Sequence, residues 1–316
     1  MFRVSLAGGA LFLLFSLVLF QRFRVIRKQK TIIEIQKAET AKAFHALHEK
    51  NKEVMDSIYY ARRIQQTLLT SDAFFKKIFG DNYFVIFRPK DIVSGDFYWA
   101  TSLGGHHKIY LAVCNSTGHG VPGAFMSLLN IGFLSEAINE KQIDKPADVL
   151  NYVRDRLVSS FGKDEQKDGF DGCLISYDPA TRILNYSAAN SRPLVVRNRT
   201  LLELNYDRMP VGAGEKKESF NNHTLQLHQG DMLYMFTDGY ADQFGGPKGK
   251  KFKLKQLQEN LLKYAELDIE NQKEKHAQIF EDWKAWKDEN GKMNELEQLD
   301  DVCLFGIRIT YTYPRM

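Results

Sequence analysis

The pattern of apolar and polar residues divides the chain into three parts. Residues 4–20 are apolar apart from two serines, and residues 31–69 contain no glycine or proline. The remaining sequence alternates short apolar runs with longer amphipathic stretches. These patterns are typical of a membrane span, a long helix and a mixed domain, respectively. We therefore expect a transmembrane anchor at 1–24, a helical linker at 25–70 and one large domain at 71–316.

The apolar segment is 17 residues long, which is the short end of what spans a bilayer. Only Arg3 precedes it, whereas a basic cluster follows it at once, at Arg22, Arg24, Arg27, Lys28 and Lys30. The positive-inside rule then places the rest of the chain in the cytoplasm. A cleaved signal peptide is the alternative, but its basic residues would come first and an Ala-x-Ala site would follow. The sequence favours a single-pass membrane protein with a cytoplasmic domain.

The linker carries a heptad seam that continues for more than three repeats. Its seam positions are Phe44, Leu47, Asn51, Val54, Ile58, Ala61, Gln65 and Leu68. An asparagine in such a seam often sets the register of a dimeric coiled coil, so the linker predicts a homodimer through residues 31–69. The alternative is a helix that packs on its own domain, and the two interpretations stand equal.

The large domain reads as strands with helices between them. Strands are expected at 82–88, 96–100, 108–113, 173–177, 184–188, 194–197, 231–236 and 302–309, and helices at 123–138, 146–161, 255–264 and 270–286. Runs of strands joined by turns favour antiparallel pairing over a series of βαβ units. The predicted fold class is therefore α/β in the broad sense, an α+β sandwich of two mainly antiparallel sheets flanked by helices.

Composition narrows the possible functions. The chain has 316 residues, of which 44% are hydrophobic and 12% aromatic, enough for a substantial core. The net charge of +4 is mild and its excess lies beside the anchor, which gives no support for nucleic-acid binding. The three cysteines lie in apolar runs without paired spacing, so we expect buried thiols in a reducing compartment.

A glycine-rich turn at 113–130 is the most distinctive stretch of the domain. An apolar strand stops at Asn115, three glycines follow, and Pro122 stands early in a helical pattern. Such a strand-to-helix turn can bring backbone amides close to a ligand. Taken alone, however, the same pattern is more often only a turn.

Several aspartates stand at the ends of predicted buried strands. Asp96 begins one strand, Asp238 follows another, and Asp300 with Asp301 precedes a third. Burying a carboxylate there is costly unless it has a partner. Oxygen ligands without a matching histidine or cysteine set favour Mg²⁺ or Mn²⁺ over Zn²⁺. Each Asp-Gly pair alone is a common turn, but three such sites around one glycine-rich turn predict a metal centre.

These motifs together resemble the SpoIIE-type branch of the PPM metal-dependent protein serine/threonine phosphatases. The stretches that carry the resemblance are 93–99 (VSGDFYW), 117–127 (TGHGVPGAFMS), 168–171 (DGFD), 237–246 (TDGYADQFGG) and 300–302 (DDV). They occur in the family's order and extend over about residues 74–309, and residues 57–65 are similar to the helix that precedes such domains. The resemblance implies a two-sheet sandwich that hydrolyses phosphoserine or phosphothreonine on a partner protein.

The resemblance also implies a ligand set for two Mn²⁺ or Mg²⁺ ions. Asp96 would serve one metal, Asp238 and Asp301 the other, Asp242 would be an auxiliary ligand, and Gly120 would lie beside the metal-bound water. Two divalent ions lower the pKa of a bridging water, which then attacks phosphorus without a protein nucleophile.

Other polar residues near these motifs have weaker assignments. His119 is either a general acid or, more often for a turn histidine, structural. Arg88 and Lys90 could meet phosphate or could be ordinary surface charges, and the basic loop at 245–251 reads as a solvated turn unless phosphate lies nearby.

Asn115 departs from the family pattern. The family has an aspartate here that bridges both metals, whereas asparagine offers one neutral carbonyl oxygen. Two hypotheses follow. The protein is a membrane-tethered phosphatase impaired by Asn115, or a catalytically dead pseudophosphatase that binds or scaffolds a phosphoprotein.

Overall fold

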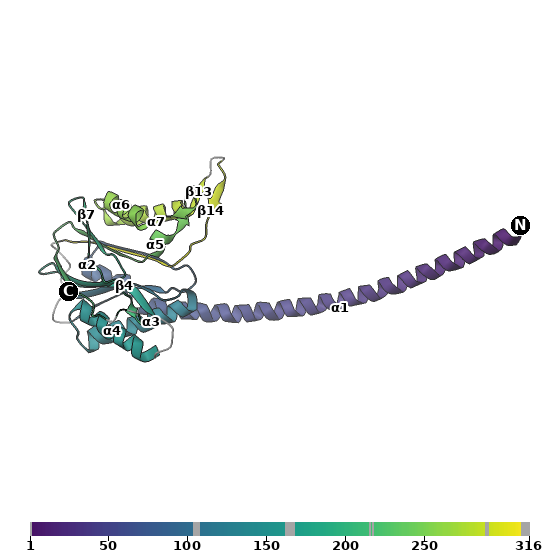
Figure 1. Ribbon diagram of the computed structural model, residues 1–316, viewed down its shortest axis with the longest axis horizontal. Coiled ribbons are helices and arrows are strands. Elements are labelled where there is room, and N and C mark those ends of the chain that lie inside the picture. The colour runs from purple at the N-terminus through teal and green to yellow at the C-terminus, as the bar shows by residue number, and fades with distance from the viewer. Residues whose placement is uncertain are drawn as a thin grey trace. The chain divides into compact units, whose positions relative to one another are not determined.

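The structure is a computed structural model that describes residues 2–103, 108–161, 168–214, 216, 218–287 and 291–310, with side chains at residue 9 and from residue 11 onward (Figure 1). The chain divides into two compact units, Met1–Ser57 and Ile58–Met316. Helix α1 (Phe2–Leu68) begins in the first unit and ends in the second. No glycine or proline interrupts it after Gly9, and Thr70 and Ser71 then lead into the next helix.

The second unit contains all the other elements. Its helices are α2 (Asp72–Phe79), α3 (Gly120–Ser135), the π-helical segment η1 (Glu136–Glu140), α4 (Pro146–Phe161), α5 (Gly239–Asp242), α6 (Leu254–Tyr264) and α7 (Ile269–Lys284). Its longer strands are β1 (Tyr83–Arg88), β2 (Asp96–Ser102), β3 (Ile109–Ser116), β4 (Gly169–Asp178), β5 (Ile183–Ala189), β10 (Met232–Phe236) and β15 (Val302–Arg308). Its shorter strands are β6 (Leu194–Arg197), β7 (Thr200–Glu203), β8 (Val211–Gly212), β9 (His223–Gln226), β11 (Phe244–Gly245), β12 (Lys250–Lys251), β13 (Ala285–Lys287) and β14 (Met293–Glu295).

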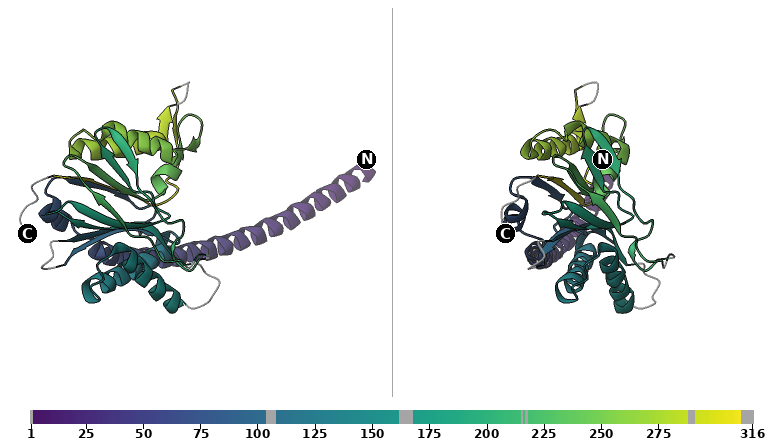
Figure 2. Two further views of the ribbon diagram at one scale, coloured as in Figure 1. Left: turned by 60° about the vertical axis from the view of Figure 1, so that its left-hand side comes forward. Right: turned by 90° about the vertical axis from the view of Figure 1, so that its left-hand side faces the viewer.

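Two antiparallel sheets stack face to face and are covered by helices on both sides (Figure 2). One sheet has the order β1-β15-β10-β6-β7, and the other has the order β2-β3-β4-β5-β9 with β8 paired to β4. Helices α3 and α4 cover the second sheet, and α6 and α7 cover the first (Figures 1 and 2). The predicted sandwich of antiparallel sheets flanked by helices is confirmed.

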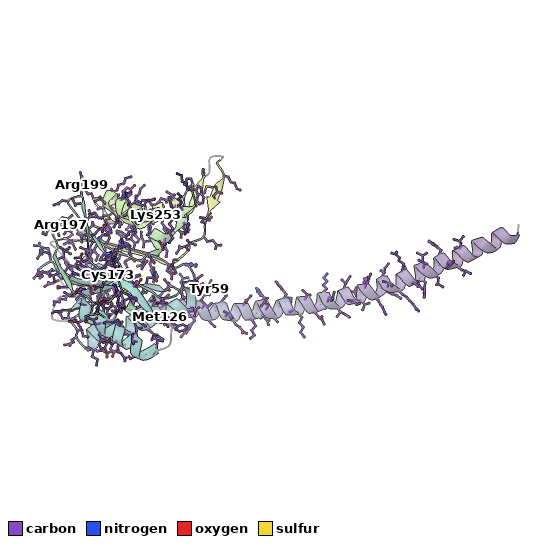
Figure 3. All side chains as sticks on the ribbon, viewed as in Figure 1. Tyr59, Met126, Cys173, Arg197, Arg199 and Lys253 are labelled. Atoms are coloured by element: carbon purple, nitrogen blue, oxygen red, sulfur yellow. The ribbon has the colours of Figure 1, made fainter. Side chains whose placement is uncertain are left out.

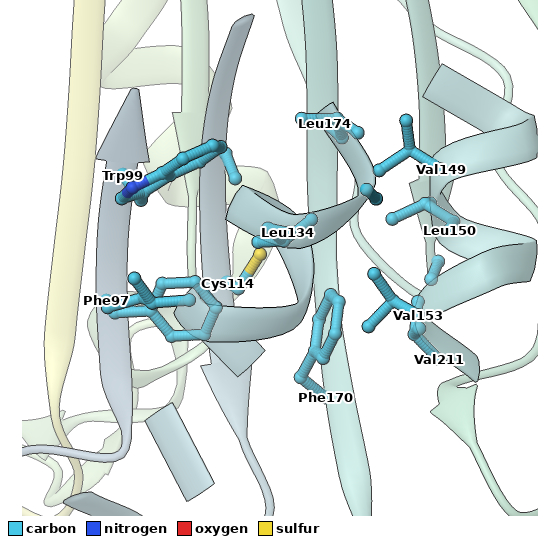
Figure 4. Packing of buried hydrophobic residues seen from close by; sticks show 14 of the residues in the cluster. Phe97, Trp99, Cys114, Leu134, Val149, Leu150, Val153, Phe170, Leu174 and Val211 are labelled. Carbon is cyan, nitrogen blue, oxygen red and sulfur yellow. The ribbon is translucent and has the colours of Figure 1, made fainter. Parts of the chain in front are cut away.

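Each interface between these layers has its own apolar core. Beneath α3 and α4, Leu134 and Val153 belong to one apolar cluster with Phe97 of β2 and Phe170 of β4, and Val153 lies on the Phe170 side of it (Figure 4). Between the sheets, Cys173 packs with residues such as Phe305, and it lies at the centre of the domain (Figure 3). The three cysteines, Cys114, Cys173 and Cys303, are all free and buried, as predicted. A third cluster lies between the first sheet and helices α6 and α7. The cluster between the sheets holds them in a fixed relation, which positions the strand ends at the site.

Most predicted elements occur, with differences at their ends. The helix Pro146–Phe161 and the strand Leu194–Arg197 have the predicted bounds. The predicted helix 270–286 ends earlier, because residues 285–287 pair with residues 293–295 as a hairpin. Helix α2 was not predicted, although Ser71 caps it by accepting from the Phe74 amide.

One helical stretch of the described residues, Gly120–Glu140, is long and apolar enough to cross a membrane. Half of that stretch is buried inside the domain, where Leu134, Ala137 and Ile138 are fully covered. A core helix passes the same test, and this stretch is such a helix. The predicted span at 4–20 includes side chains that lie outside the described residues, so it stays a prediction.

The end of α1 packs on its own domain. Gln65 is buried; its Nε2 donates to the Ser94 carbonyl at 2.6 Å and to Ser127 Oγ at 2.8 Å, and its Oε1 accepts from the Ser94 amide at 3.1 Å. Phe44 and Leu47, by contrast, are exposed along the first unit. The C-terminal part of the predicted seam therefore packs on its own domain, as the alternative interpretation predicts. The earlier part has exposed apolar side chains.

A buried histidine is expected to make the folded domain less stable at low pH. His276 of α7 is fully buried beside the rings of Phe84 and Tyr264, and within the described part of the chain neither ring nitrogen has a hydrogen-bond partner. Burial lowers the pKa of His276 from 6.5 to about 4. Between pH 6.5 and pH 4, His276 is therefore protonated in the unfolded chain and neutral in the folded chain. The free energy of unfolding should then decrease by about 3 kcal/mol as the pH falls from above 6.5 to 4.

The variant His276→Phe isolates this effect from the other acid-sensitive groups. Urea unfolding of wild type and variant should show a difference in unfolding free energy that grows in favour of the variant from pH 7 to pH 4. A difference that is constant over this range would contradict the assignment of the acid sensitivity to His276.

Candidate metal centre

Asp96 is the most deeply buried carboxylate of the predicted site. It begins β2 and is fully buried, and its Oδ2 accepts from Thr237 Oγ1 at 2.6 Å. Its Oδ1 is buried without any hydrogen-bond partner in the described structure. Burial raises the pKa of Asp96 well above its usual value, and the charges of Asp301 and Asp238 raise it further. A buried, unpaired acceptor beside other acids is a position where a cation would be stabilising.

Close backbone packing places the glycine-rich turn against Asp96. Gly118 has φ of +87°, and a Cβ added at Gly95 or Gly123 would lie only 2.4 Å or 2.2 Å from the Gly118 carbonyl oxygen. Only glycines allow this approach. The start of α3 is thereby held beside the start of β2.

Asn115 lies in a row with two carboxylates. It pairs with Asp96 of β2 on one side and with Asp171 of β4 on the other. Its Nδ2 donates to Asp238 Oδ1 at 2.8 Å. Asn115 thus presents a hydrogen-bond donor to Asp238, where an aspartate would present a second anion.

Asp238 stands where β10 ends, one residue before α5. Partial loss of water around the Asp238 carboxyl raises its pKa, and the charges of Asp300 and Asp242 add to this effect. Gly239 permits the β10 and β15 ends to meet, because a Cβ there would be 1.9 Å from the Asp301 carbonyl oxygen.

The two adjacent acids before β15 have different surroundings. Asp301 is buried, and its Oδ1 and Oδ2 accept from the backbone amides of Lys90 and Gly95, both at 2.7 Å. Asp300 is partly exposed and accepts from the Asp301 amide at 2.8 Å. Asp300 also lines a cavity of about 430 Å³ together with Asn115. Asp301 therefore ties the β1–β2 connection to β15, and Asp300 faces the open site.

Asp242 lies one helical turn beyond Asp238. Its Oδ2 pairs with Lys251 Nζ at 2.9 Å, and both side chains are nearly half exposed. Asp242 and Asp238 line a second cavity, of about 180 Å³, that also includes Asn115 and Asp171. The basic loop predicted as a solvated turn therefore brings one lysine to the rim of the site.

The remaining predicted residues lie at the periphery. His119 is exposed, and its Nδ1 lies 3.3 Å from Asp91 Oδ2. Gly120 begins α3, and a Cβ there would lie 3.2 Å from the same Asp91 oxygen. Arg88 forms an ion pair with Glu281 of α7.

The sequence model of the family described as stage II sporulation protein E (SpoIIE) matches residues 105–310. The chain belongs to this family. Among curated proteins, none matches the chain closely enough to count as a relative.

Solved structures show the same fold in other SpoIIE-like and PP2C domains. The PP2C domain of SiaA from Pseudomonas aeruginosa is 26% identical with a TM-score of 0.71, over 82% of this chain and 98% of that one. The PP2C phosphatase domain of SpoIIE from Bacillus subtilis, with a fragment of its regulatory domain, is 20% identical with a TM-score of 0.56. The RsbU and RsbW domains of Rv1364c from Mycobacterium tuberculosis are 18% identical with a TM-score of 0.57. The match to the SpoIIE structure covers 74% of this chain and 63% of that one. The match to the Rv1364c structure covers 75% of this chain and 62% of that one. This SpoIIE-family domain therefore has the fold of PP2C phosphatases.

The carboxylates of this SpoIIE-family chain surround one region without forming a closed cage. Within the described ranges, no group of three or more His, Cys, Asp or Glu residues is arranged as a ready-made metal site. The unpaired Asp96 Oδ1 is nevertheless an acceptor that only a cation or a donor would satisfy. The residues present fit a divalent metal that draws them together.

Sequence reasoning gives a specific ligand role to neither of two carboxylates at this region, although Asp300 is among the strand-end acids that predict a metal centre. Asp171 belongs to one of the family motifs without a role of its own, yet β4 places it directly opposite Asn115. Asp300 is the neighbour of the predicted ligand Asp301, yet it is Asp300 that lines the cavity. Strand register reveals Asp171 and the lining of the cavity reveals Asp300, and one sequence contains neither.

Proposed function

We propose that this protein is a membrane-tethered, metal-dependent protein serine/threonine phosphatase that Asn115 has weakened. Its substrate would be a phosphorylated partner protein. The observation that carries the proposal is the buried, unpaired Asp96 Oδ1, which lies beside other acids in a SpoIIE-family fold. Ionised carboxylates that lie close together repel one another, and bound divalent ions would remove that energetic cost.

The predicted metal ligands are Asp96, Asn115, Gly120, Asp238, Asp242 and Asp301. The contacts of this chain favour Asp300 over Asp301 for direct metal contact, because both Asp301 oxygens already accept backbone amides. Bound Mn²⁺ or Mg²⁺ would supply the positive charge that activates water and neutralises a phosphate ester. Asp96 and Asp238 would fix the ions, while Asn115 would contribute at most one neutral oxygen.

A second candidate function is a pseudophosphatase that binds a phosphoprotein without hydrolysing it. One set of observations favours it. Asn115 donates to Asp238, Asn190 donates to Asp171, and Lys251 pairs with Asp242. These donors satisfy several acids without any metal, as a binding module would need.

We further propose that residues 4–20 anchor the chain and that the domain lies in the cytoplasm. The apolar run and the basic cluster after it support this. The division into an anchor at 1–24, a linker at 25–70 and a phosphatase domain at 71–316 belongs to the same proposal.

The linker would connect an input signal to the site. Gln65 contacts Ser94, which lies two residues before Asp96, and Ser127, which lies on the helix that follows the glycine-rich turn. A rotation or shift of α1 would therefore act on both elements that shape the site. This arrangement supports a relay from the linker to the carboxylates.

The linker prediction can be tested on a peptide of residues 31–69. If its seam dimerises, the peptide should be helical by circular dichroism, with a melting temperature that rises with concentration. Replacing Asn51 with leucine should raise that temperature and loosen the preference for one oligomeric state, because a seam asparagine trades stability for register. A peptide that sediments as a monomer up to millimolar concentration would leave only packing on the domain.

The proposed activity can be tested on the full chain in detergent micelles. We expect hydrolysis of a phosphoserine peptide at millimolar Mn²⁺, loss of that activity in Asp238→Ala, and no loss in Asp178→Asn, a partly exposed acid at the other end of β4. Mn²⁺ binding without hydrolysis would favour the pseudophosphatase. Neither binding nor hydrolysis at any Mn²⁺ concentration would overturn the metal-dependent phosphatase.

A further inference from the structure

Three neighbouring strands place three side chains in one row at the site. Asp96 of β2 pairs with Asn115 of β3, and Asn115 pairs with Asp171 of β4. Residues directly opposite in antiparallel strands point to the same face, with Cβ atoms about 5 Å apart. Asp96 contacts Thr237 and Asn115 contacts Asp238, so the row faces the end of β10. An anion thus stands on each side of the neutral Asn115.

The surroundings of Asp171 suit a ligand for a cation. It lines both cavities of the site, one with Asp238 and the other with Asp300. Among the described residues, its hydrogen-bond donor is Asn190, whose Nδ2 lies 2.9 Å from Oδ1. The unpaired, fully buried Asp96 Oδ1 at the other end of the row independently indicates an absent positive charge.

We propose that Asp171 supplies the anionic metal ligand that Asn115 cannot provide, so that one ion is held toward the β3–β4 side of the site with Asp238. The inference rests on the proposed metal dependence and concerns which strand contributes the charge. It explains how a site that lacks its bridging carboxylate would retain a divalent ion.

The competing explanation is structural. Asp171 accepts from Asn190, which has a positive φ of 50°, and the bond could simply fix the turn after β5. The variant Asp171→Asn separates the two roles. Its side chain keeps an oxygen that accepts from Asn190 and loses only the negative charge.

The experiment measures Mn²⁺ affinity of the full chain in detergent, by calorimetry and by the electron paramagnetic resonance signal of free Mn²⁺. Asp171→Asn should weaken Mn²⁺ binding by at least about ten- to a hundredfold, because losing even an outer-shell partner of a metal ligand costs that much. In the Asn115→Asp background, where the bridging anion is restored, the same change should alter affinity by no more than about threefold. Asp178→Asn, on the same strand but away from the site, should leave affinity unchanged.

The outcomes separate this inference from the proposed function. If Asp171→Asn causes a large loss of Mn²⁺ affinity in the wild type and a small one in the Asn115→Asp background, the ligand role of Asp171 is supported, provided that metal-free thermal unfolding is unchanged. If Asp171→Asn changed Mn²⁺ affinity equally in both backgrounds, or in neither, the ligand role of Asp171 would be overturned. The proposed function would still stand in that case, provided that Asp238→Ala abolished Mn²⁺ binding. If neither the wild type nor Asn115→Asp bound Mn²⁺, the proposed function itself would fail.

Discussion

Replacing Asn115 with aspartate is expected to lower the Mn²⁺ concentration needed for hydrolysis by about two to three orders of magnitude, since an added charge about 4 Å from a cation is worth roughly 4 kcal/mol per unit charge at an effective dielectric of about 20. The substitution would also replace the donor that faces Asp238 with a second anion. The same change should therefore have opposite effects on the metal-free and metal-bound protein.

Without metal, Asn115→Asp should lose about 1–3 kcal/mol of stability, because the hydrogen bond to Asp238 becomes a repulsion. With saturating Mn²⁺, the variant should unfold at a higher temperature than the wild type under the same conditions. Thermal unfolding with and without Mn²⁺ measures both effects on one sample. Asn115→Ala is the matched control, because it removes the donor without adding charge, and it should lower metal-free stability without raising affinity.

The possible results of Asn115→Asp separate the two candidate functions. A lower Mn²⁺ requirement together with turnover identifies an impaired phosphatase. Tighter Mn²⁺ binding without turnover identifies a binding module whose pocket no longer supports hydrolysis. If neither affinity nor rate changed, Asn115 would not be near a metal and the whole site assignment would be wrong.

The parts of the fold that apolar patterning determines were predicted well. The helix Pro146–Phe161 has one apolar face, and its buried residues include Val149, Val153 and Leu157. The strands that form the middle of each sheet are runs of buried residues, as in β10. Burial of apolar area drives both patterns, so they are legible in one sequence. Short edge strands such as β7 and β9 bury little and leave a weaker pattern.

The site was harder to predict because it depends on register between distant segments. Asp300 and Asp301 are adjacent, and only the pairing of β15 decides that one meets backbone amides and the other meets the cavity. Asp171 becomes a neighbour of Asn115 through the β3–β4 ladder. Gln65 fits a heptad seam as well as it fits its actual contacts on Ser94. In each case the local sequence permits two environments and tertiary packing selects one.

The two proposed ligands Asp238 and Asp96 should differ in how strongly metal binding depends on them. Asp238→Ala should abolish the Mn²⁺-induced rise in unfolding temperature, whereas Asp96→Ala should only reduce it. Asp238 lies at the rim, where it feels the charges of Asp300 and Asp242. Asp96 serves the side of the site that Asn115 has already weakened, so less binding energy remains to be lost there.

Metal-free stability provides the internal check on that comparison. Asp238→Ala leaves the Asn115 amide without its partner, which should cost about 1–3 kcal/mol. Asp96→Ala removes a buried acceptor that has no partner at Oδ1, although it also opens a small cavity beside Thr237. A larger metal-free loss for Asp238→Ala than for Asn115→Ala would show that the acid has contacts beyond that amide. Equal, tight Mn²⁺ binding by calorimetry in Asp238→Ala and Asp96→Ala would remove both residues from the ligand set.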